Sequence, residues 1–290
     1  MAISFWKIKK IQWQKPNNYL LLGIFSGMIL ICINLLSKAN DGSLMGTSIL
    51  YWWAIGSMLW SKRDSLSLES GLIGTTLGSS VLLLLLLKSA YIQGYDPFLR
   101  IMPLLIGLGL GLLASGIIGL KQYWKELFIL VFLVPPPSAL AMLIDISPLT
   151  AKFSTALLWY SGFDVVREGN FIFTPNGGIE VYSGCSGIDM MLHLLGLSTL
   201  FIAIFPTNRT QKMVLPLFAL VLAFVVNSIR VSIMTILSHP ANSVAFEYWH
   251  KGDGSLLFST LAVVLLATFC LFNSSSGNSN DDLTDIFEQD

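Results

Sequence analysis

The sequence predicts an all-α membrane protein, one polytopic bundle of about eight transmembrane helices with a small outward-facing β-hairpin-like segment. Its 290 residues are 54% hydrophobic and only 12% charged, with a mean hydropathy of +0.70, whereas a soluble domain carries about 25% charged residues. The apolar residues also gather in runs of about 17–25 residues, the length that crosses a bilayer. One longer polar stretch, residues 163–184, interrupts these runs.

The predicted spans follow one another with short connections. A further apolar segment, residues 150–162, is too short to cross and predicts an interfacial or re-entrant helix. The run that starts at residue 44 is the least regular, because it is rich in aromatic residues. The predicted spans are 19–37, 44–60, 66–87, 101–120, 127–145, 188–205, 213–237 and 254–272.

The distribution of lysine and arginine predicts the orientation of the bundle, because short cytoplasmic loops carry an excess of both residues. With a cytoplasmic N-terminus, the inside segments hold ten of them and the outside segments six. We therefore expect a basic cytoplasmic N-terminus (1–18), a single transmembrane catalytic domain (19–272) and a disordered, acidic cytoplasmic tail (273–290). Both termini are then cytoplasmic.

The polar stretch 163–184 contains two short β-like runs, 171–174 and 179–182, around the sequence "PNGG". Asn-Gly between apolar runs is typical of a hairpin. The hairpin is either a plain connector or a cap that positions the cysteine that follows it.

Composition also limits the cofactors and partners. A net charge of zero gives no case for nucleic-acid binding. The three cysteines are odd in number and widely spaced, which argues against a disulfide framework or a zinc site, so we expect no metal and no cofactor. Cys32 and Cys270 lie inside apolar runs, where cysteine usually acts as a small hydrophobic residue.

The third cysteine, Cys185, stands in "VYSGCSGIDMMLHLL" at the start of the predicted span 188–205. A helix N-terminus carries positive partial charge, which favours a thiolate, and Gly184 and Gly187 allow a sharp turn and a close approach of substrate. Cys185 is therefore a candidate nucleophile. The alternative is one more small apolar residue at the start of a buried helix.

Arg230 lies inside the apolar span 213–237, where an arginine costs about 2.5–3.5 kcal/mol on insertion scales and is a functional candidate. Asn227 precedes it by three residues and shares its helical face. At 1.5 Å per residue, Arg230 is about 25 Å along the span, near its outer end and level with Cys185. The alternative is an arginine that extends to the outer headgroups.

His250 falls in "FEYWHKGDGSLLF", on the outer side before the last span. Histidine is the usual proton carrier near neutral pH, although an interfacial residue in an aromatic belt is the alternative. Asp189 is within reach of Cys185 as a rival base or as a partner of Arg230. His193 lies about 12 Å deeper, and a His-Pro helix stop explains His239.

Three spans thus bring a thiol, a guanidinium and an imidazole to one face of the predicted bundle. A nucleophile, a cation for the developing oxyanion and a proton carrier are the groups that thiol acyl transfer requires.

These motifs resemble the exosortase/archaeosortase family of multi-pass membrane cysteine transpeptidases. The resemblance rests on "CSG" (Ser186 and Gly187 after the cysteine) opening a span, "NSIR" near the outer end of the next, and "WH" with Gly254 downstream. The lead-in "VVREGNFI" is also similar, and the match covers about residues 125–265. Members often have a basic or bulky residue soon after "CSG", where this chain has Asp189; the cyanobacterial branch is one candidate subfamily.

The resemblance implies Cys185 as nucleophile, Arg230 as partner of the oxyanion or of a substrate carboxylate, and His250 as acid and base. It implies an enzyme of the bacterial plasma membrane with its active site on the outer face. Its substrates would be secreted proteins whose C-terminal sorting signal, of PEP-CTERM type, has a short motif, an apolar span and a basic end. The new C-terminus would pass to a surface acceptor, a glycan or a lipid.

Two other classes remain open. A transporter is expected to carry broken or polar helices near the midplane and internal repeats; "VPPPSAL" at 134–140 breaks a span, but no repeat is visible. A non-catalytic assembly factor for polysaccharide or protein export would tolerate the loss of Cys185, Arg230 or His250.

Overall fold

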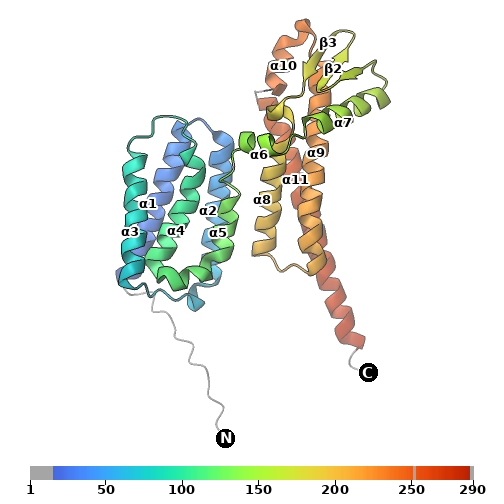
Figure 1. Ribbon diagram of the computed structural model, residues 1–290. Helices are drawn as coiled ribbons and strands as arrows, with labels where there is room; N and C mark the ends of the chain where they lie inside the picture. Colours follow the sequence, from blue (N-terminus) through green and yellow to red (C-terminus); the bar gives the residue numbers. More distant parts are fainter. Residues whose placement is uncertain (1–15, 251–252, 288–290) are drawn as a thin grey trace. The chain divides into compact units, whose positions relative to one another are not determined.

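The computed structural model describes residues 16–250 and 253–287, so most of the expected basic segment 1–18 lies outside the described residues. The chain divides into two compact units, Met1–Pro135 and Pro136–Asp290. Figure 1 shows the helices and strands of each unit along the chain.

The first unit is a bundle of helices. Helix α4 packs most extensively against α3 and also contacts α1. Helices α3 and α4 approach closely, and glycine at position 78 makes this possible. A Cβ atom at Gly78 would lie only 2.6 Å from the backbone N of Leu113. The helices are α1 (Pro16–Lys38), α2 (Gly42–Ser61), α3 (Leu72–Ser89), α4 (Phe98–Gly119) and α5 (Trp124–Val131), with short 3₁₀ turns η1 (Arg63–Ser65) and η2 (Leu120–Tyr123).

Helix α5 packs back against α4 instead of continuing it. Near the end of α4 the backbone leaves helical geometry at Gly116, with φ 68° and ψ −174°, a conformation that favours glycine. A Cβ atom at Gly107 of α4 would lie 2.9 Å from Leu130 and 3.2 Å from Leu127 of α5. The turn at 116–123 therefore reverses the chain.

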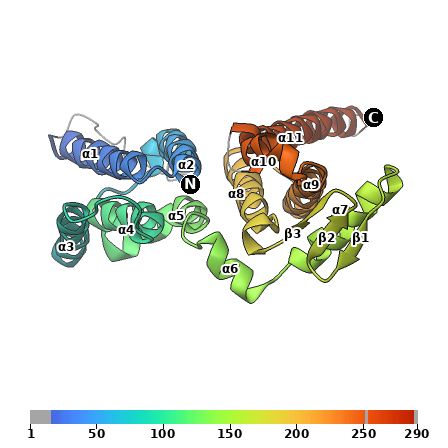
Figure 2. The same cartoon turned by 90° about the horizontal axis from the view of Figure 1, so that it is seen from above.

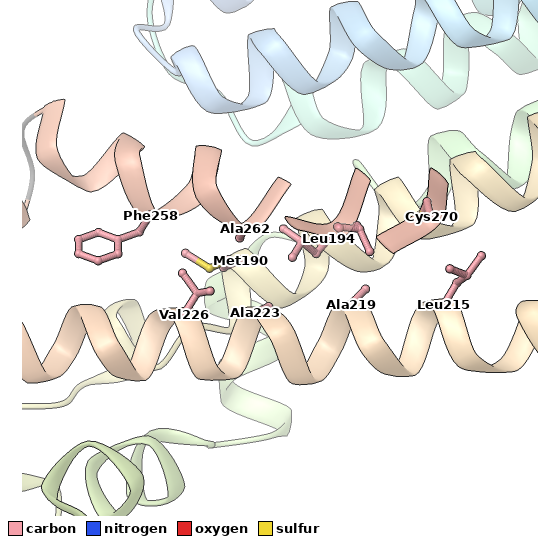
Figure 3. Packing of buried hydrophobic residues seen from close by; sticks show 10 residues of the cluster. Met190, Leu194, Leu215, Ala219, Ala223, Val226, Phe258, Ala262 and Cys270 are labelled. Carbon is pink, nitrogen blue, oxygen red and sulfur yellow. The ribbon is translucent and has the colours of Figure 1, made fainter. Parts of the chain in front are cut away.

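The second unit holds three long or apolar helices and a small sheet, which Figure 2 shows from above. Helices α8, α9 and α11 share a buried core that includes Leu194, Ala219, Ala223, Ala262 and Cys270 (Figure 3). The elements are α6 (Pro137–Leu143), α7 (Ser147–Tyr160), β1 (Val166–Glu168), β2 (Phe171–Thr174), β3 (Gly177–Glu180), η3 (Ser183–Cys185), α8 (Ile188–Ile204), α9 (Arg209–Ile236), η4 (Pro240–Asn242), α10 (Ser243–His250) and α11 (Asp253–Phe287).

The predicted hairpin is present as part of a three-stranded antiparallel sheet in the order β1-β2-β3. Strands β2 and β3 meet across Pro175 and Asn176, so β3 starts two residues earlier than the pattern indicates. One face of the sheet packs on α7 and α9 through Ile172 and Val181, which are fully buried. Strand β1, which its charged residues did not suggest, completes the sheet.

The expected number of eight spans is not confirmed. Within the described residues, five helices are long and apolar enough to cross a membrane, or up to six if the bent pair α6 and α7 counts as one span. That total counts 98–131 once, although α5 folds back on α4, and it excludes α8, which has 17 residues. Helix α11 continues to Phe287, through most of the predicted tail 273–290.

The run 127–145 does not form one helix. It is divided between α5 and α6 by residues 132–136, because Pro135, Pro136 and Pro137 lack the N–H groups that a continuous helix needs. Helices α6 and α7 then meet at a bend of 93°. The segment 150–162, expected to be interfacial or re-entrant, therefore belongs to a broken pair rather than to a straight span.

Candidate functional site

A cavity of about 200 Å³ lies in the second unit, between β3, α9 and α10. It combines polar side chains with an apolar wall, and its residues come from segments up to 72 positions apart, from 178 to 250. The lining residues are Gly178, Ile179, Glu180, Tyr182, Cys185, Arg230, Val231, Met234, Phe246 and His250.

Cys185 and His250 face each other in this cavity. The Sγ atom of Cys185 lies 3.6 Å from Nε2 of His250, within hydrogen-bond distance for sulfur. Cys185 ends the 3₁₀ turn η3, and His250 is the last residue of α10. Both side chains are partly buried, so they remain accessible from the cavity. The pair has the arrangement of a thiol and its proton acceptor.

Arg230 lines the same cavity from α9. One of its terminal nitrogens, Nη2, donates a hydrogen bond to the backbone carbonyl of His250 at 2.8 Å. Its Nε atom is buried and has no partner among the described residues. The guanidinium therefore fixes the end of α10 and retains a donor, which suits it to a negatively charged or carbonyl oxygen.

Two hydrogen bonds and a glycine fix the backbone around Cys185. Asn227 of α9 donates from Nδ2 to the carbonyl of Cys185 at 2.9 Å, and Thr150 of α7 donates to the carbonyl of Ser186 at 2.8 Å. Gly187 has φ 96°, and a Cβ atom there would lie 2.7 Å from Nδ2 of Asn227. Glycine is thus required both by the left-handed backbone and by the close approach of α9.

Other candidate residues take different places. The hydroxyl of Ser186 is buried and donates to the carbonyl of Ser183, while Gly184 packs against the ring of Tyr182. The carboxylate of Asp189 is exposed and lies 3.3 Å from Nδ1 of His193. The cavity lining does not include Asp189 or His193, nor does it include Gly184 or Ser186.

His239 is also outside the cavity and caps η4 by accepting a hydrogen bond from the N–H of Ala241 at 3.1 Å. This contact agrees with its expected place at a His-Pro stop.

Tyr182 is a cavity residue that the sequence reasoning missed. A hydrogen bond with the Cys185 side chain is the largest cause that raises the pKa of Tyr182; burial and the negative charge of the ionised Cys185 side chain raise it further, and the charge of Arg230 lowers it. The phenol consequently stays protonated at neutral pH and can donate to sulfur or to a substrate oxygen. Tyr182 stands three residues before Cys185 in the sequence, a spacing that carries no distinctive signal of its own.

The described residues contain no group of three or more His, Cys, Asp or Glu side chains placed to hold a metal ion. Cys32 and Cys270 are buried in the packing of the two units, as their apolar surroundings indicate.

These features define a class: a multi-helix membrane protein in which a thiol, an imidazole and a guanidinium from three elements share one cavity. The model of the family described as transmembrane exosortase (Exosortase_EpsH) matches residues 39–267. The chain therefore belongs to the transmembrane exosortase family. No curated protein and no solved structure matched it.

Proposed function

We propose that the protein is a membrane cysteine transpeptidase or protease that uses Cys185 as its nucleophile, Arg230 as its cation and His250 as its acid and base. The observation that carries this proposal is the 3.6 Å distance between Cys185 Sγ and His250 Nε2 in a cavity that Arg230 also lines. Membership of the exosortase family supports the same chemistry.

In the first half-reaction, His250 takes the proton of the Cys185 thiol as sulfur attacks a peptide carbonyl. A C–S bond forms, and the carbonyl oxygen becomes an oxyanion that the guanidinium of Arg230 stabilises. When the C–N bond breaks, His250 returns the proton to the leaving amine. The product is a thioester between Cys185 and the substrate's new C-terminus.

In the second half-reaction, an acceptor amine or hydroxyl attacks the thioester and His250 removes its proton. The C–S bond breaks, and the thiolate recovers the proton from His250. Water in place of the acceptor gives hydrolysis, so transfer and proteolysis share every group of the site. A surface glycan or lipid is the proposed acceptor.

The proposed substrates are secreted proteins with a C-terminal sorting signal of a short motif, an apolar span and a basic end. The proposed orientation places both termini in the cytoplasm and the cavity at the outer surface of the bacterial plasma membrane. A peptide bond just outside the substrate's own span would then meet the thiol at that surface.

A processing assay in membranes tests the function. A secreted reporter with such a tail is co-expressed with the wild type, with Cys185→Ser or with Cys270→Ala, and its mass is followed. We expect trimming by the wild type and Cys270→Ala but none by Cys185→Ser, with the mass of the new C-terminus separating transfer from hydrolysis. Equal trimming by wild type and Cys185→Ser would assign Cys185 a structural role.

A further inference from the structure

On the edge of β3 that faces away from β2, some backbone groups have no hydrogen-bond partner among residues 16–250 and 253–287. The N–H of Val181 donates to the carbonyl of Asn170 at 2.9 Å, which fixes the alternation of the ladder. In an antiparallel pair, every second residue directs its N–H and C=O away from the partner strand. At β3 these residues are Gly178 and Glu180, and no hydrogen bond to their backbone is present on the open side within the described residues.

This open edge borders the candidate site. Gly178, Ile179 and Glu180 line the same cavity as Cys185 and His250. Neighbouring strands lie about 4.7–4.9 Å apart, so a peptide paired with β3 would lie in the cavity beside the thiol. Ile179 packs against the core on one face of the sheet, which leaves the exposed residues Gly178 and Glu180 toward the other face.

The opposite edge of the same sheet differs. By the register of β1 with β2, Arg167 is the β1 residue whose N–H and C=O point outward. Its guanidinium donates to the carbonyl of Gly169, and Glu168 adds a second charge beside it. Charged side chains are a common protection of edge strands. Strand β3 instead begins with two glycines, which contribute no charged side chain of their own to protect the first half of its edge.

A second observation points to the same occupant. The Nε atom of Arg230 is buried without a partner among the described residues, and Arg230 lines the cavity that β3 borders. A peptide strand on β3 brings carbonyl oxygens into this cavity, and such an oxygen is the acceptor that the Nε donor lacks. The strand edge and this unpaired donor are thus both complementary to the carbonyl oxygens of an extended backbone.

From these observations we infer that the substrate binds as an added β-strand: the extended segment next to its scissile bond pairs with the open edge of β3 through the backbone of Gly178 and Glu180. This inference rests on the proposed function and states how the substrate is held. Main-chain pairing supplies affinity, and the cavity wall selects among side chains. Strand pairing also determines which substrate carbonyl lies beside Cys185, because the register of the pairing fixes the position of each residue.

Substitution of Glu180 by proline tests the pairing. Glu180→Pro removes one outward N–H and leaves the bonds to β2 in place; proline is tolerated on edge strands when its N–H side is open. Glu180→Ala keeps the N–H and isolates the loss of the carboxylate. Arg167→Pro removes the equivalent outward N–H at the other edge, and serves as the matched control.

Binding is measured with a fluorescent synthetic peptide of the reporter's tail motif, using the full chain in lipid nanodiscs with Cys185→Ala in every variant. We expect Glu180→Pro to raise the Kd about tenfold over Glu180→Ala, the effect of one lost hydrogen bond to a bound ligand. Arg167→Pro is expected to leave the Kd unchanged. Thermal unfolding of each variant reports whether the sheet is intact.

The outcomes separate this inference from the proposed function. If Glu180→Pro and Glu180→Ala bind equally while the wild type still trims the reporter, strand pairing is wrong and the transpeptidase function stands. If the peptide binds with the expected difference but the wild type does not trim, the function fails and the docking mode stands. If a stably folded Cys185→Ala protein binds no peptide, the inference is overturned. If Glu180→Pro unfolds, a peptide N-methylated in turn at each residue replaces it, and equal binding by all N-methylated forms overturns the pairing.

Discussion

Each unit contains a cavity, and two basic side chains, Lys62 in the first unit and Arg230 in the second, differ in whether their donors are all paired. In the first unit, Lys62 Nζ lies 2.8 and 2.9 Å from the two carboxylate oxygens of Glu126 and 2.6 Å from the carbonyl of Gln122. An ammonium group has three donors, so these acceptors satisfy it. In the second unit, the buried Nε donor of Arg230 has no partner within the part of the chain that the structure describes.

The cavities differ in the same way. The first, about 400 Å³, is lined mainly by aliphatic and aromatic side chains of α1, α2, α4 and α5, and its charged member, Glu126, is already paired. The second is smaller and holds a thiol, an imidazole and a guanidinium. A charge with every partner in place stabilises a fold, whereas a charge with an unfilled donor beside a nucleophile is available to a ligand.

Among the substitutions that test this comparison, that of His250 is expected to change the trimming rate most. His250→Ala removes the proton acceptor 3.6 Å from Cys185 Sγ, and we expect the trimming rate to fall by about 10²–10⁴-fold, the usual contribution of a general acid–base. The rate of reporter trimming at equal protein level measures it. His239→Ala, at a histidine outside the cavity, is the control; an equal loss in both variants would contradict the assignment.

Arg230→Lys sharpens the comparison because it keeps the charge and removes the fork of donors. We expect a loss of about 10²-fold in trimming rate, since a lysine ammonium cannot reproduce both the bond to the His250 carbonyl and a second donor for the oxyanion. Arg230→Ala should lose more. Full activity of Arg230→Lys would show that charge alone suffices.

Tyr182→Phe should have a smaller effect. The Cys185 side chain and burial raise the pKa of the phenol, so the protonated phenol is available to donate one hydrogen bond in the cavity, an interaction worth about 0.5–1.5 kcal/mol. We expect the rate of Cys185 alkylation at pH 7 to fall a few-fold. Tyr160→Phe, at an exposed tyrosine of α7, provides the baseline, and a rate that does not change would remove Tyr182 from the site.

Glu126→Gln should leave the trimming rate per folded molecule unchanged and reduce stability instead. It removes the charge that pairs with Lys62, which is 27% exposed in its side chain, and we expect unfolding to become easier by about 1–3 kcal/mol, less than for a fully buried pair. Thermal unfolding in detergent measures the change. If Glu126→Gln lowered the trimming rate without lowering stability, the first unit would contribute directly to catalysis.

The sequence predicted the helical class, the hairpin and the residues that meet in the cavity, because each has a local signal. Cys185 lies between glycines, Arg230 interrupts an apolar run, and His250 precedes the last span. The number of spans was less predictable. Hydropathy measures the length of an apolar run, but it does not reveal that α5 folds back on α4 or that α6 and α7 bend by 93°.

The open edge of β3 and the role of Tyr182 could not be predicted for a different reason. Backbone direction in a strand depends on register, which long-range pairing decides, and a tyrosine near a cysteine has no distinctive pattern. The contact of Asn227 with the Cys185 carbonyl likewise joins residues 42 positions apart. Shared helical face indicated that Asn227 accompanies Arg230 but not which group it would bind.

The separation of Cys185 and His250 by 65 positions has a consequence for timing during synthesis. A ribosome adds about 5–20 residues per second, so the imidazole is made roughly 3–13 s after the thiol. Until α10 has been inserted and docked, the nascent chain carries the cysteine without its neighbour. The pair therefore forms only after synthesis has passed His250, and a chain that stalls between the two residues carries the thiol without its imidazole.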